Sequence, residues 1–332
     1  MAKFSKFFDF GVPFTPCNLD CNYCYVRQRE RIGGRGHTHG NSLNYPIEHI
    51  AQALSAKRLG GESIVNLCAA GETMLPEYIP QLIKSLLQEG HFVMVVTNAT
   101  LTEQFIEISK FEPALLDRLF FKCSLQLLEL KRLELLDVFF ENIRLIKKIG
   151  ASFTVEVTPV DELETHINEI IDICSINVGA LPHLSLPRHD ESKELKSRHS
   201  LHEFAKIWGV FNSPMFDFKV KYWGEKRNEF CYAGKHSFLI NGSTGDFYKC
   251  YMQGISQNLY EDITIPIDFE PVGYNCKMSH CFNAHVLLAL GCIPEINDVT
   301  YADVRDRIDS NTGENWLNPT MHSVFSQRFR NT

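Results

Sequence analysis

Three cysteines close to the N-terminus constrain this chain more than any other feature. Cys17, Cys21 and Cys24 follow a C-x3-C-x2-C spacing, directly after the apolar run 7–14, which predicts a β-strand. Three thiols on one short loop can converge on one centre, and thiolate is the ligand type that iron–sulfur clusters and zinc need. A structural zinc site needs a fourth ligand, and none lies close to this loop in the sequence. Three thiolates on a four-iron cluster would leave one iron open to bind and activate a substrate. The alternative is that these cysteines bind zinc or form a disulfide.

Length and composition bound the class of protein. The 332 residues can hold one large domain and a smaller one, and the 44% apolar and 22% charged residues are typical of globular proteins. A formal net charge of −7 argues against a protein built around nucleic acid. We see no signal peptide and no transmembrane stretch, so the eleven cysteines indicate metal ligands and core thiols rather than disulfides. We therefore expect a cytoplasmic location, no membrane and no nucleic-acid partner.

Strand and helix patterns alternate after the cysteine loop. Beyond the first strand, five more are predicted at 63–68, 91–97, 119–125, 151–159 and 181–186. Helices are predicted between them at 47–59, 76–89, 102–111, 128–149 and 162–174. This alternation implies a parallel sheet with helices outside, and active residues of such folds lie at the carboxyl ends of the strands. The pattern alone leaves open whether the sheet is open or a barrel.

The pattern changes after about residue 186. A charged linker is predicted at 188–198 and a helix at 201–210, followed by an aromatic-rich strand at 216–223. Two runs, 237–240 and 247–251, flank a polar Asn-Gly-Ser-Thr-Gly-Asp turn and predict a β-hairpin. The tail from residue 305 is polar, and we expect that only docking against the rest of the protein orders part of it.

The cysteine loop, with Tyr23 directly before the third cysteine, resembles the signature of the radical S-adenosylmethionine (SAM) enzymes. The resemblance implies a 4Fe-4S cluster on Cys17, Cys21 and Cys24 with SAM on its open iron. It also implies a partial six-stranded (β/α)6 barrel, here residues 1–200, whose open side admits the substrate. Reductive cleavage of SAM would give a 5′-deoxyadenosyl radical, and an electron donor such as flavodoxin or ferredoxin would reduce the cluster.

Several polar residues at strand ends match positions that hold SAM in this family. Ala69-Ala70-Gly71-Glu72 resembles its Gly-Gly-Glu motif, although Ala70 replaces the first Gly; a plain turn is the alternative reading. Gly71 would allow close backbone approach, and Glu72 or carbonyls beside it would accept from the SAM ammonium. The remaining residues that the resemblance assigns to cofactor binding are Tyr23 over the adenine, Asn98 after the third strand, and Ser124 and Gln126 after the fourth.

A second set of cysteines follows a C-x13-G-x4-C pattern through Cys231, Gly245 and Cys250. This pattern resembles the opening of the auxiliary-cluster extensions called SPASM and twitch domains, which implies that residues 201–332 form a small iron–sulfur extension. Cys276 and Cys281 would complete the ligands of one auxiliary 4Fe-4S cluster. The full SPASM pattern has about seven cysteines and only five are present, so Cys292 is a core thiol, a substitute ligand or a functional thiol. Zinc suits four thiolates equally well.

Three residues are candidates for a direct role with the substrate. Cys123 is either a buried core thiol or, near the lumen, a hydrogen-atom donor to a substrate radical. Glu156 interrupts an apolar strand pattern and either faces the lumen or pairs with a basic group. Tyr222, with Lys221 and the stretch 188–190, is a possible substrate contact.

The resemblance implies an oxidoreductase or maturase that abstracts a hydrogen atom from its substrate. A peptide or protein, which would be oxidised, cross-linked or epimerised, is the first expectation. A dehydrogenase or epimerase for an aminosugar, nucleoside or other small polar metabolite is the alternative. A zinc- or iron–sulfur-stabilised electron-transfer or binding protein is the non-enzymatic alternative.

Overall fold

A computed structural model describes residues 3–26, 28, 42–190, 192–251, 254–281 and 283–329. Nine strands form one sheet in the order β6-β5-β4-β3-β2-β1-β7-β8-β9. Their bounds are β1 (Lys6–Val12), β2 (Ser63–Ala69), β3 (Phe92–Thr97), β4 (Leu119–Ser124), β5 (Ser152–Val157), β6 (His183–Leu184), β7 (Ser237–Asn241), β8 (Asp246–Tyr248) and β9 (Ile255–Asn258). Strands β1 to β6 are all parallel and stand in chain order, and the sheet is open rather than closed. This confirms the predicted six-stranded partial barrel.

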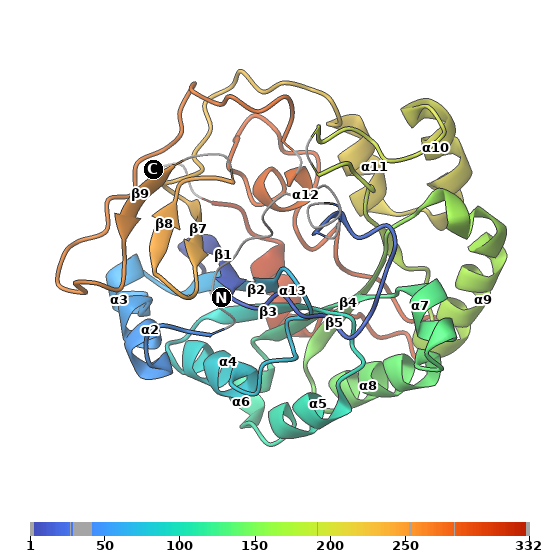
Figure 1. Cartoon of the computed structure of the whole chain (residues 1–332), viewed down its shortest axis with the longest axis horizontal. Helices are drawn as coiled ribbons and strands as arrows, with labels where there is room; N and C mark the ends of the chain where they lie inside the picture. The colour runs from blue at the N-terminus through green and yellow to red at the C-terminus, as the bar shows by residue number, and fades with distance from the viewer. Residues whose placement is uncertain are drawn as a thin grey trace.

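The C-terminal third of the chain extends the same sheet. Strand β7 pairs parallel with β1, on the edge opposite β2, and β8 and β9 continue antiparallel (orange in Figure 1). The predicted hairpin is therefore present, and its first strand is joined to the barrel by backbone hydrogen bonds. A separate domain from residue 201 stays a prediction.

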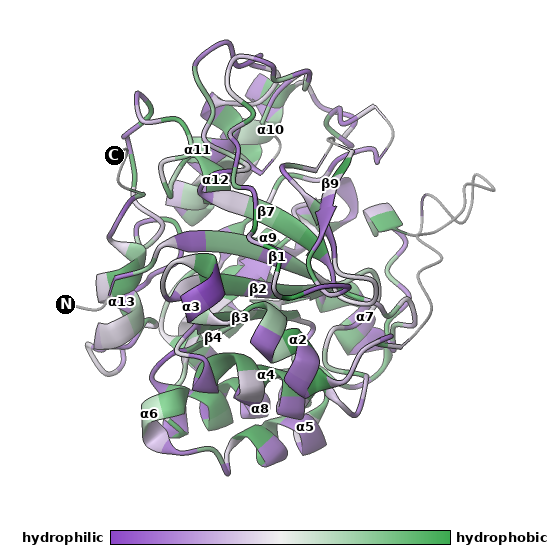
Figure 2. Ribbon diagram, turned by 90° about the vertical axis from the view of Figure 1, so that its left-hand side faces the viewer, coloured by the Kyte–Doolittle hydropathy of each residue, from purple (hydrophilic) through white to green (hydrophobic). Residues whose placement is uncertain are grey.

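Helices cover one face of the sheet and the C-terminal segments cover the other. The helices are α2 (Ile47–Ala53), α3 (Ala56–Leu59), α4 (Ile79–Gln88), α5 (Thr102–Ile108), α6 (Pro113–Leu116), α7 (Leu127–Arg132), α8 (Leu136–Lys148), α9 (Ile167–Val178), α10 (Leu201–Trp208), α11 (Pro214–Lys221), α12 (Ala284–Leu287) and α13 (Pro319–Phe325), with 3-10 turns η1 (Asp161–His166) and η2 (Gly209–Phe211). Figure 2 shows the sheet between a layer with α4, α5 and α8 and a layer with α10, α11 and α12.

Alternation along the strands divides the core in two. One set of strand side chains, which includes Phe8, Val65 and Phe121, packs under the helix layer. The alternate set, which includes Phe7 and Phe120, packs against α12 and α13. Because successive side chains of a strand point to opposite faces, this second set marks what we call the inner face of the sheet.

Two predicted helices are interrupted. The helix predicted over 128–149 breaks between α7 and α8, where Glu134 takes a left-handed φ of 57°. The leucine-rich sequence contains no glycine or proline there, so nothing in its pattern marks the break. The helix predicted over 47–59 likewise divides at Leu54 and Ser55.

The strand predicted over 216–223 is wrong, because residues 216–221 belong to helix α11 and residues 222 and 223 follow its end. Pro214 occupies the first turn, and the Ser213 hydroxyl accepts a hydrogen bond from the Phe216 N–H at 3.3 Å. Serine before proline is a helix-start signal. The aromatic residues Phe216 and Phe218, which predicted a strand, are instead the buried side of the helix.

The tail from residue 305 docks against the rest of the protein, as expected, over its described residues, which end at 329. Arg305 is fully buried, and α13 packs Met321, Val324 and Phe325 against the inner face. The Trp316 indole donates to the Val178 carbonyl at 3.0 Å. The tail is therefore part of the core.

Candidate active site

The loop after β1, which carries the three cysteines, is fastened to the loop after β2. The Gly71 N–H donates to the Phe14 carbonyl and the Glu72 N–H to the Pro16 carbonyl, each at 3.0 Å. A Cβ on residue 71 would lie 1.9 Å from the Pro16 oxygen. The close backbone approach expected at Gly71 is present, and its partner is the cysteine loop itself.

The Glu72 carboxylate joins the end of β2 to the end of β3. It accepts hydrogen bonds from the Thr97 hydroxyl at 2.6 Å, the Asn98 N–H at 2.8 Å and the Met74 N–H at 3.0 Å. Burial raises its pKa and these bonds oppose the rise. Because both oxygens are engaged, the backbone carbonyls beside Glu72 are the better acceptors for an ammonium; this role stays a prediction.

The other predicted cofactor residues converge on the same place. The Tyr23 hydroxyl donates to the Gln126 amide oxygen, which links the cysteine loop to the end of β4. The Asn98 amide donates to Asn18 at 2.7 Å, and Asn18 donates to the Thr100 hydroxyl at 2.8 Å. Asn18 and Thr100 were not predicted; the position of Asn18 inside the cysteine motif was the available signal.

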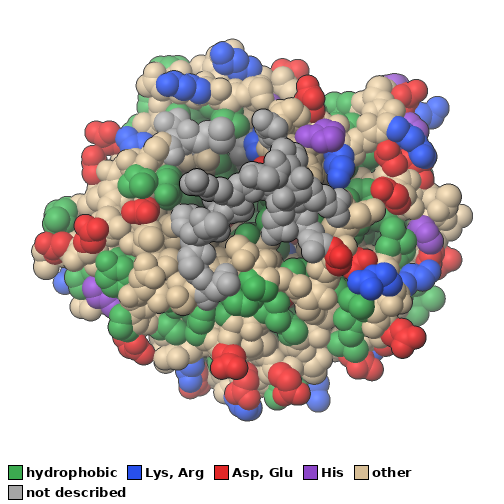
Figure 3. All heavy atoms as spheres, in the orientation of Figure 1, with side chains coloured by type: hydrophobic (Ala, Val, Ile, Leu, Met, Phe, Trp, Pro, Cys, Tyr) green, Lys and Arg blue, Asp and Glu red, His purple; other side chains and the backbone are tan. Residues whose placement is uncertain are grey.

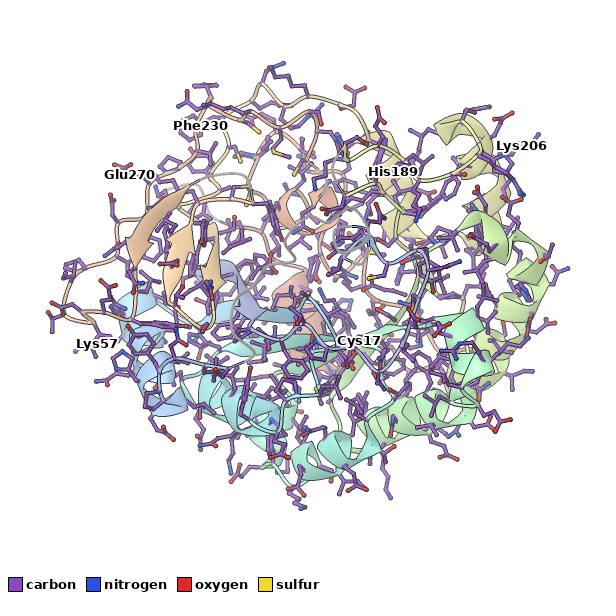
Figure 4. The ribbon with its side chains drawn as sticks, viewed as in Figure 1. Cys17, Lys57, His189, Lys206, Phe230 and Glu270 are labelled. Atoms are coloured by element: carbon purple, nitrogen blue, oxygen red, sulfur yellow. The ribbon has the colours of Figure 1, made fainter. Side chains whose placement is uncertain are left out.

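A cavity of about 530 Å³ opens at these strand ends, a volume suited to a small-molecule cofactor. The predicted residues that line it are Cys17, Cys21, Cys24, Tyr23, Gly71, Glu72, Asn98, Ser124 and Gln126. Arg188 also lines it, with its guanidinium 4.5 Å from the centroid of the Tyr25 ring. Figure 4 shows Cys17 near the middle of the molecule in that view.

The thiols of the N-terminal loop lie close enough together to affect one another's protonation. Burial raises the pKa of Cys21 to about 12, and the thiols of Cys24 and Cys17 add to the rise, so joint deprotonation needs a bound cation. A cation that three thiolates share is the kind of centre that iron–sulfur clusters provide.

The second cysteine set also comes together. Burial raises the pKa of Cys281 well above its usual value, and the four nearby thiols Cys250, Cys231, Cys292 and Cys276 add to the rise. The Cys292 sulfur lies 3.3 Å from the Ser237 hydroxyl. All five predicted thiols are thus neighbours, and Cys292 is the most enclosed of them.

Gly245, the glycine of the C-x13-G-x4-C pattern, is needed for close packing. Its φ is +81°, and a Cβ there would lie 2.4 Å from the Tyr260 ring. The pattern therefore marks a turn that must pass close to Tyr260.

The three catalytic candidates have different positions. Cys123 is fully buried among the side chains under the helix layer, on the face of β4 opposite to Lys122, so it is a core thiol and the alternative position near the lumen is wrong. Glu156 faces the inner side and forms an ion pair with Arg305, which combines both readings of it. Tyr222 lies at the end of α11, where its hydroxyl donates a hydrogen bond to Asp298, and it does not line the cavity.

No protein-family model matches the chain. SuiB of Streptococcus suis bound to S-adenosylmethionine is similar in structure, with a TM-score of 0.52 and 15% identity over 78% of this chain and 64% of SuiB. SuiB bound to the precursor peptide SuiA also matches, with a TM-score of 0.52 and 14% identity over 79% and 64%. anSMEcpe with bound AdoMet and Kp18Cys peptide matches with a TM-score of 0.50 and 13% identity over 79% of each chain. Both are radical SAM enzymes of the SPASM type.

The chain has the radical SAM fold. A curated S-adenosylmethionine-dependent nucleotide dehydratase of Lacinutrix mariniflava is 31% identical over 101 residues, which are 29% of this chain and 20% of the relative. The chain thus spans a fifth of that relative and just under two thirds of SuiB. Within the described ranges, no helix of this radical SAM fold is long and apolar enough to cross a bilayer.

Proposed function

We propose that this protein is a radical SAM enzyme, with Cys17, Cys21 and Cys24 as the ligands of its 4Fe-4S cluster. The observation that carries the proposal is the junction of the cysteine loop with Gly71 and Glu72, beside the cavity. A bound cluster would supply one electron to SAM, which would break its C5′–S bond to give methionine and the 5′-deoxyadenosyl radical that abstracts a hydrogen atom from the substrate. The same reading makes the protein an oxidoreductase or maturase that takes its electron from a flavodoxin or ferredoxin.

The chain's own residues would bind and orient SAM. Tyr23 and Gln126, bonded to each other, form the wall where an adenine packs, and Ser124 lies at the end of the neighbouring β4. Backbone carbonyls between Ala69 and Glu72 are held towards the cysteine loop and would accept from the SAM ammonium. These groups enclose the reaction and exclude water from it.

Four of the five C-terminal thiols would hold an auxiliary 4Fe-4S cluster. We propose Cys231, Cys250, Cys276 and Cys281 as its ligands, because Cys292 is completely buried and already contacts the Ser237 hydroxyl. This extension, residues 201–332, is joined to the barrel through the β1–β7 pairing. A cluster there would accept an electron from the substrate radical, which completes a net oxidation, or relay electrons.

A peptide or protein is the proposed substrate class. The support is the similarity to SuiB with the peptide SuiA and to anSMEcpe with the peptide Kp18Cys. A small polar metabolite such as a nucleotide is the second candidate, favoured by the sequence similarity to a nucleotide dehydratase.

Iron analysis and product formation test the proposal. Protein reconstituted without oxygen should hold about eight irons per chain, and Cys17→Ala, Cys21→Ala and Cys24→Ala should each lower this towards four. Each substitution should also abolish 5′-deoxyadenosine formation from SAM under reduction. Cys174→Ala, at a buried thiol of α9, is the matched control and should change neither value. Turnover that survives loss of Cys17 would contradict the assignment.

A further inference from the structure

Two lysines are buried on the inner face beside the proposed SAM cavity. Lys122 projects from β4, is 8% exposed, and lies two residues before Ser124, which lines the cavity. Lys219 projects from α11, is 5% exposed, and donates to the hydroxyl of Ser185, another cavity residue, at 2.9 Å. Two ammonium groups from separate elements therefore lie just beneath the cavity.

Neither lysine has a carboxylate partner in the part of the chain that the structure describes. No ion pair joins Lys122 or Lys219 to an acid, and the Lys122 ammonium makes no hydrogen bond to a described residue. Glu156, the acid nearest in the sheet, is paired with Arg305. Buried charges in proteins are paired, so two unpaired ammonium groups at one cavity are costly without an anion.

Charges of both signs surround the two lysines. Burial lowers the pKa of Lys122, and Glu156 and Asp9 oppose this shift, although the Asp9 oxygens already accept hydrogen bonds from Tyr251 and Asn66. Burial and the nearby charges of Arg188 and Arg305 lower the pKa of Lys219, and Glu156 opposes this shift. The surface also has Lys and Arg interspersed with Asp and Glu over the face drawn in Figure 3.

Arg305 also presents hydrogen-bond donors without acceptors. Its Nε and Nη2 are buried and have no hydrogen-bond acceptor among the described residues, and its guanidinium lies 4.9 Å from the centroid of the Tyr301 ring. These two nitrogens form the edge of a guanidinium that binds an oxyanion through two bonds. The inner face therefore offers oxyanion donors on three elements.

From this placement we infer that Lys122 and Lys219 bind a substrate oxyanion, a phosphate or a carboxylate, at the floor of the cavity. The inference rests on the proposed function, because it takes the molecule above the lysines to be the substrate of the radical reaction. Arg305 stands behind the lysines as a further donor, and Glu156 keeps its charge balanced. The substrate would thus be anchored at its anionic group and present its carbon framework to the cofactor.

Binding calorimetry on the reconstituted protein with saturating SAM tests the inference. Pyrophosphate and glutarate are the probes, and at least one should bind and release heat. Lys122→Met and Lys219→Met should each weaken that binding about tenfold or more, which is the usual effect of losing a charged hydrogen bond. Lys122→Arg should retain it. Lys131→Met is the matched control, because Lys131 pairs with Glu169 at the surface, and it should leave binding unchanged.

The outcomes separate the possible sources of the oxyanion. A response to pyrophosphate alone indicates a phosphorylated metabolite, and one to glutarate alone indicates a carboxylate such as a peptide side chain. The inference fails if neither probe binds, or if the lysine variants bind both probes as well as the wild type does. It also fails if the variants lose affinity for SAM instead, because the lysines would then recognise the SAM carboxylate. Iron content and SAM affinity of each variant show that it is folded. No turnover is measured, so failure of the proposed function would appear separately, as absent 5′-deoxyadenosine.

Discussion

At the scale of single residues, Gly71 is the position where the two cofactor loops meet, and it accepts no side chain. Gly71→Ala would force apart the loops after β1 and β2, because the new Cβ would lie 1.9 Å from the Pro16 oxygen. We expect loss of most SAM binding and destabilisation of about 1–3 kcal/mol, the usual cost of overpacking. Equilibrium SAM binding and denaturant unfolding measure the two effects. Gly209→Ala, where a Cβ meets nothing within 4 Å, should change neither, and normal SAM affinity in the Gly71 variant would contradict the argument.

Lys219 gives the residue-scale prediction about pH. Burial first, then the charge of Arg188, lowers its pKa from 10.5 to about 7. A base whose pKa is lower in the folded state stabilises the fold less as the pH falls from 10.5 towards 7, because the unfolded chain binds the proton more readily. Lys219→Met removes this dependence. In the apoprotein, the variant should therefore be more stable than the wild type at pH 7, by up to several kcal/mol, and this advantage should shrink as the pH rises to 10. Thermal midpoints at pH 7, 8.5 and 10 measure it; a constant difference across this range would contradict a lowered pKa.

At the scale of secondary-structure elements, Ser213 both begins α11 and attaches it to the sheet. Its hydroxyl accepts hydrogen bonds from the Phe216 N–H at 3.3 Å and from the Leu184 N–H of β6 at 3.1 Å. Ser213→Ala would leave both buried donors without a partner, so we expect a loss of about 2 kcal/mol or more in unfolding free energy. Ser200→Ala, which removes the exposed cap of α10, should cost only about 1 kcal/mol. Chemical denaturation compares the two variants, and equal losses would show that the contact with β6 adds nothing.

The sequence correctly predicts the strands whose continuous apolar pattern results from burial in the central sheet. The five apolar runs up to 159 became strands within a few residues of their predicted bounds, because burial on both faces demands continuous apolar sequence. Residues 216–223 were mistaken because aromatic residues suit a strand and the buried side of a helix equally. The break at Glu134 had no signal at all, since only tertiary packing decides where that helix divides.

In the candidate site, too, some residues could be predicted from the sequence and others could not. Cys17, Gly71 and Asn98 were predicted from local motifs, because chemistry and close backbone approach restrict which residue can stand there. The partners Glu156–Arg305 and Lys219–Ser185 lie 149 and 34 residues apart in the chain. No local pattern could join them, because the pairing depends on where the tail and α11 dock. The inner face is thus the part of the site that only the folded structure reveals.

At the scale of the whole molecule, the C-terminal tail closes the inner face of the barrel through one buried ion pair. Arg305 is completely buried and pairs with Glu156 of β5, whose side chain is 17% exposed, so the ion pair between the tail and the sheet is largely buried. Removing one partner of a buried pair typically costs about 3–5 kcal/mol, because the other charge stays buried without compensation. Arg305→Met should therefore destabilise the protein by about that amount.

The double variant Arg305→Met, Glu156→Gln distinguishes this electrostatic effect from a general loss of packing. With both charges removed, most of the stability should return, because the penalty belongs to the unpaired carboxylate. Limited proteolysis should cut the tail near residue 305 in the single variant and spare it in the double one. Equal instability of the two variants in denaturant would mean that the guanidinium holds the tail by its contacts with Tyr301 and its neighbours, and that the ion pair contributes nothing beyond them.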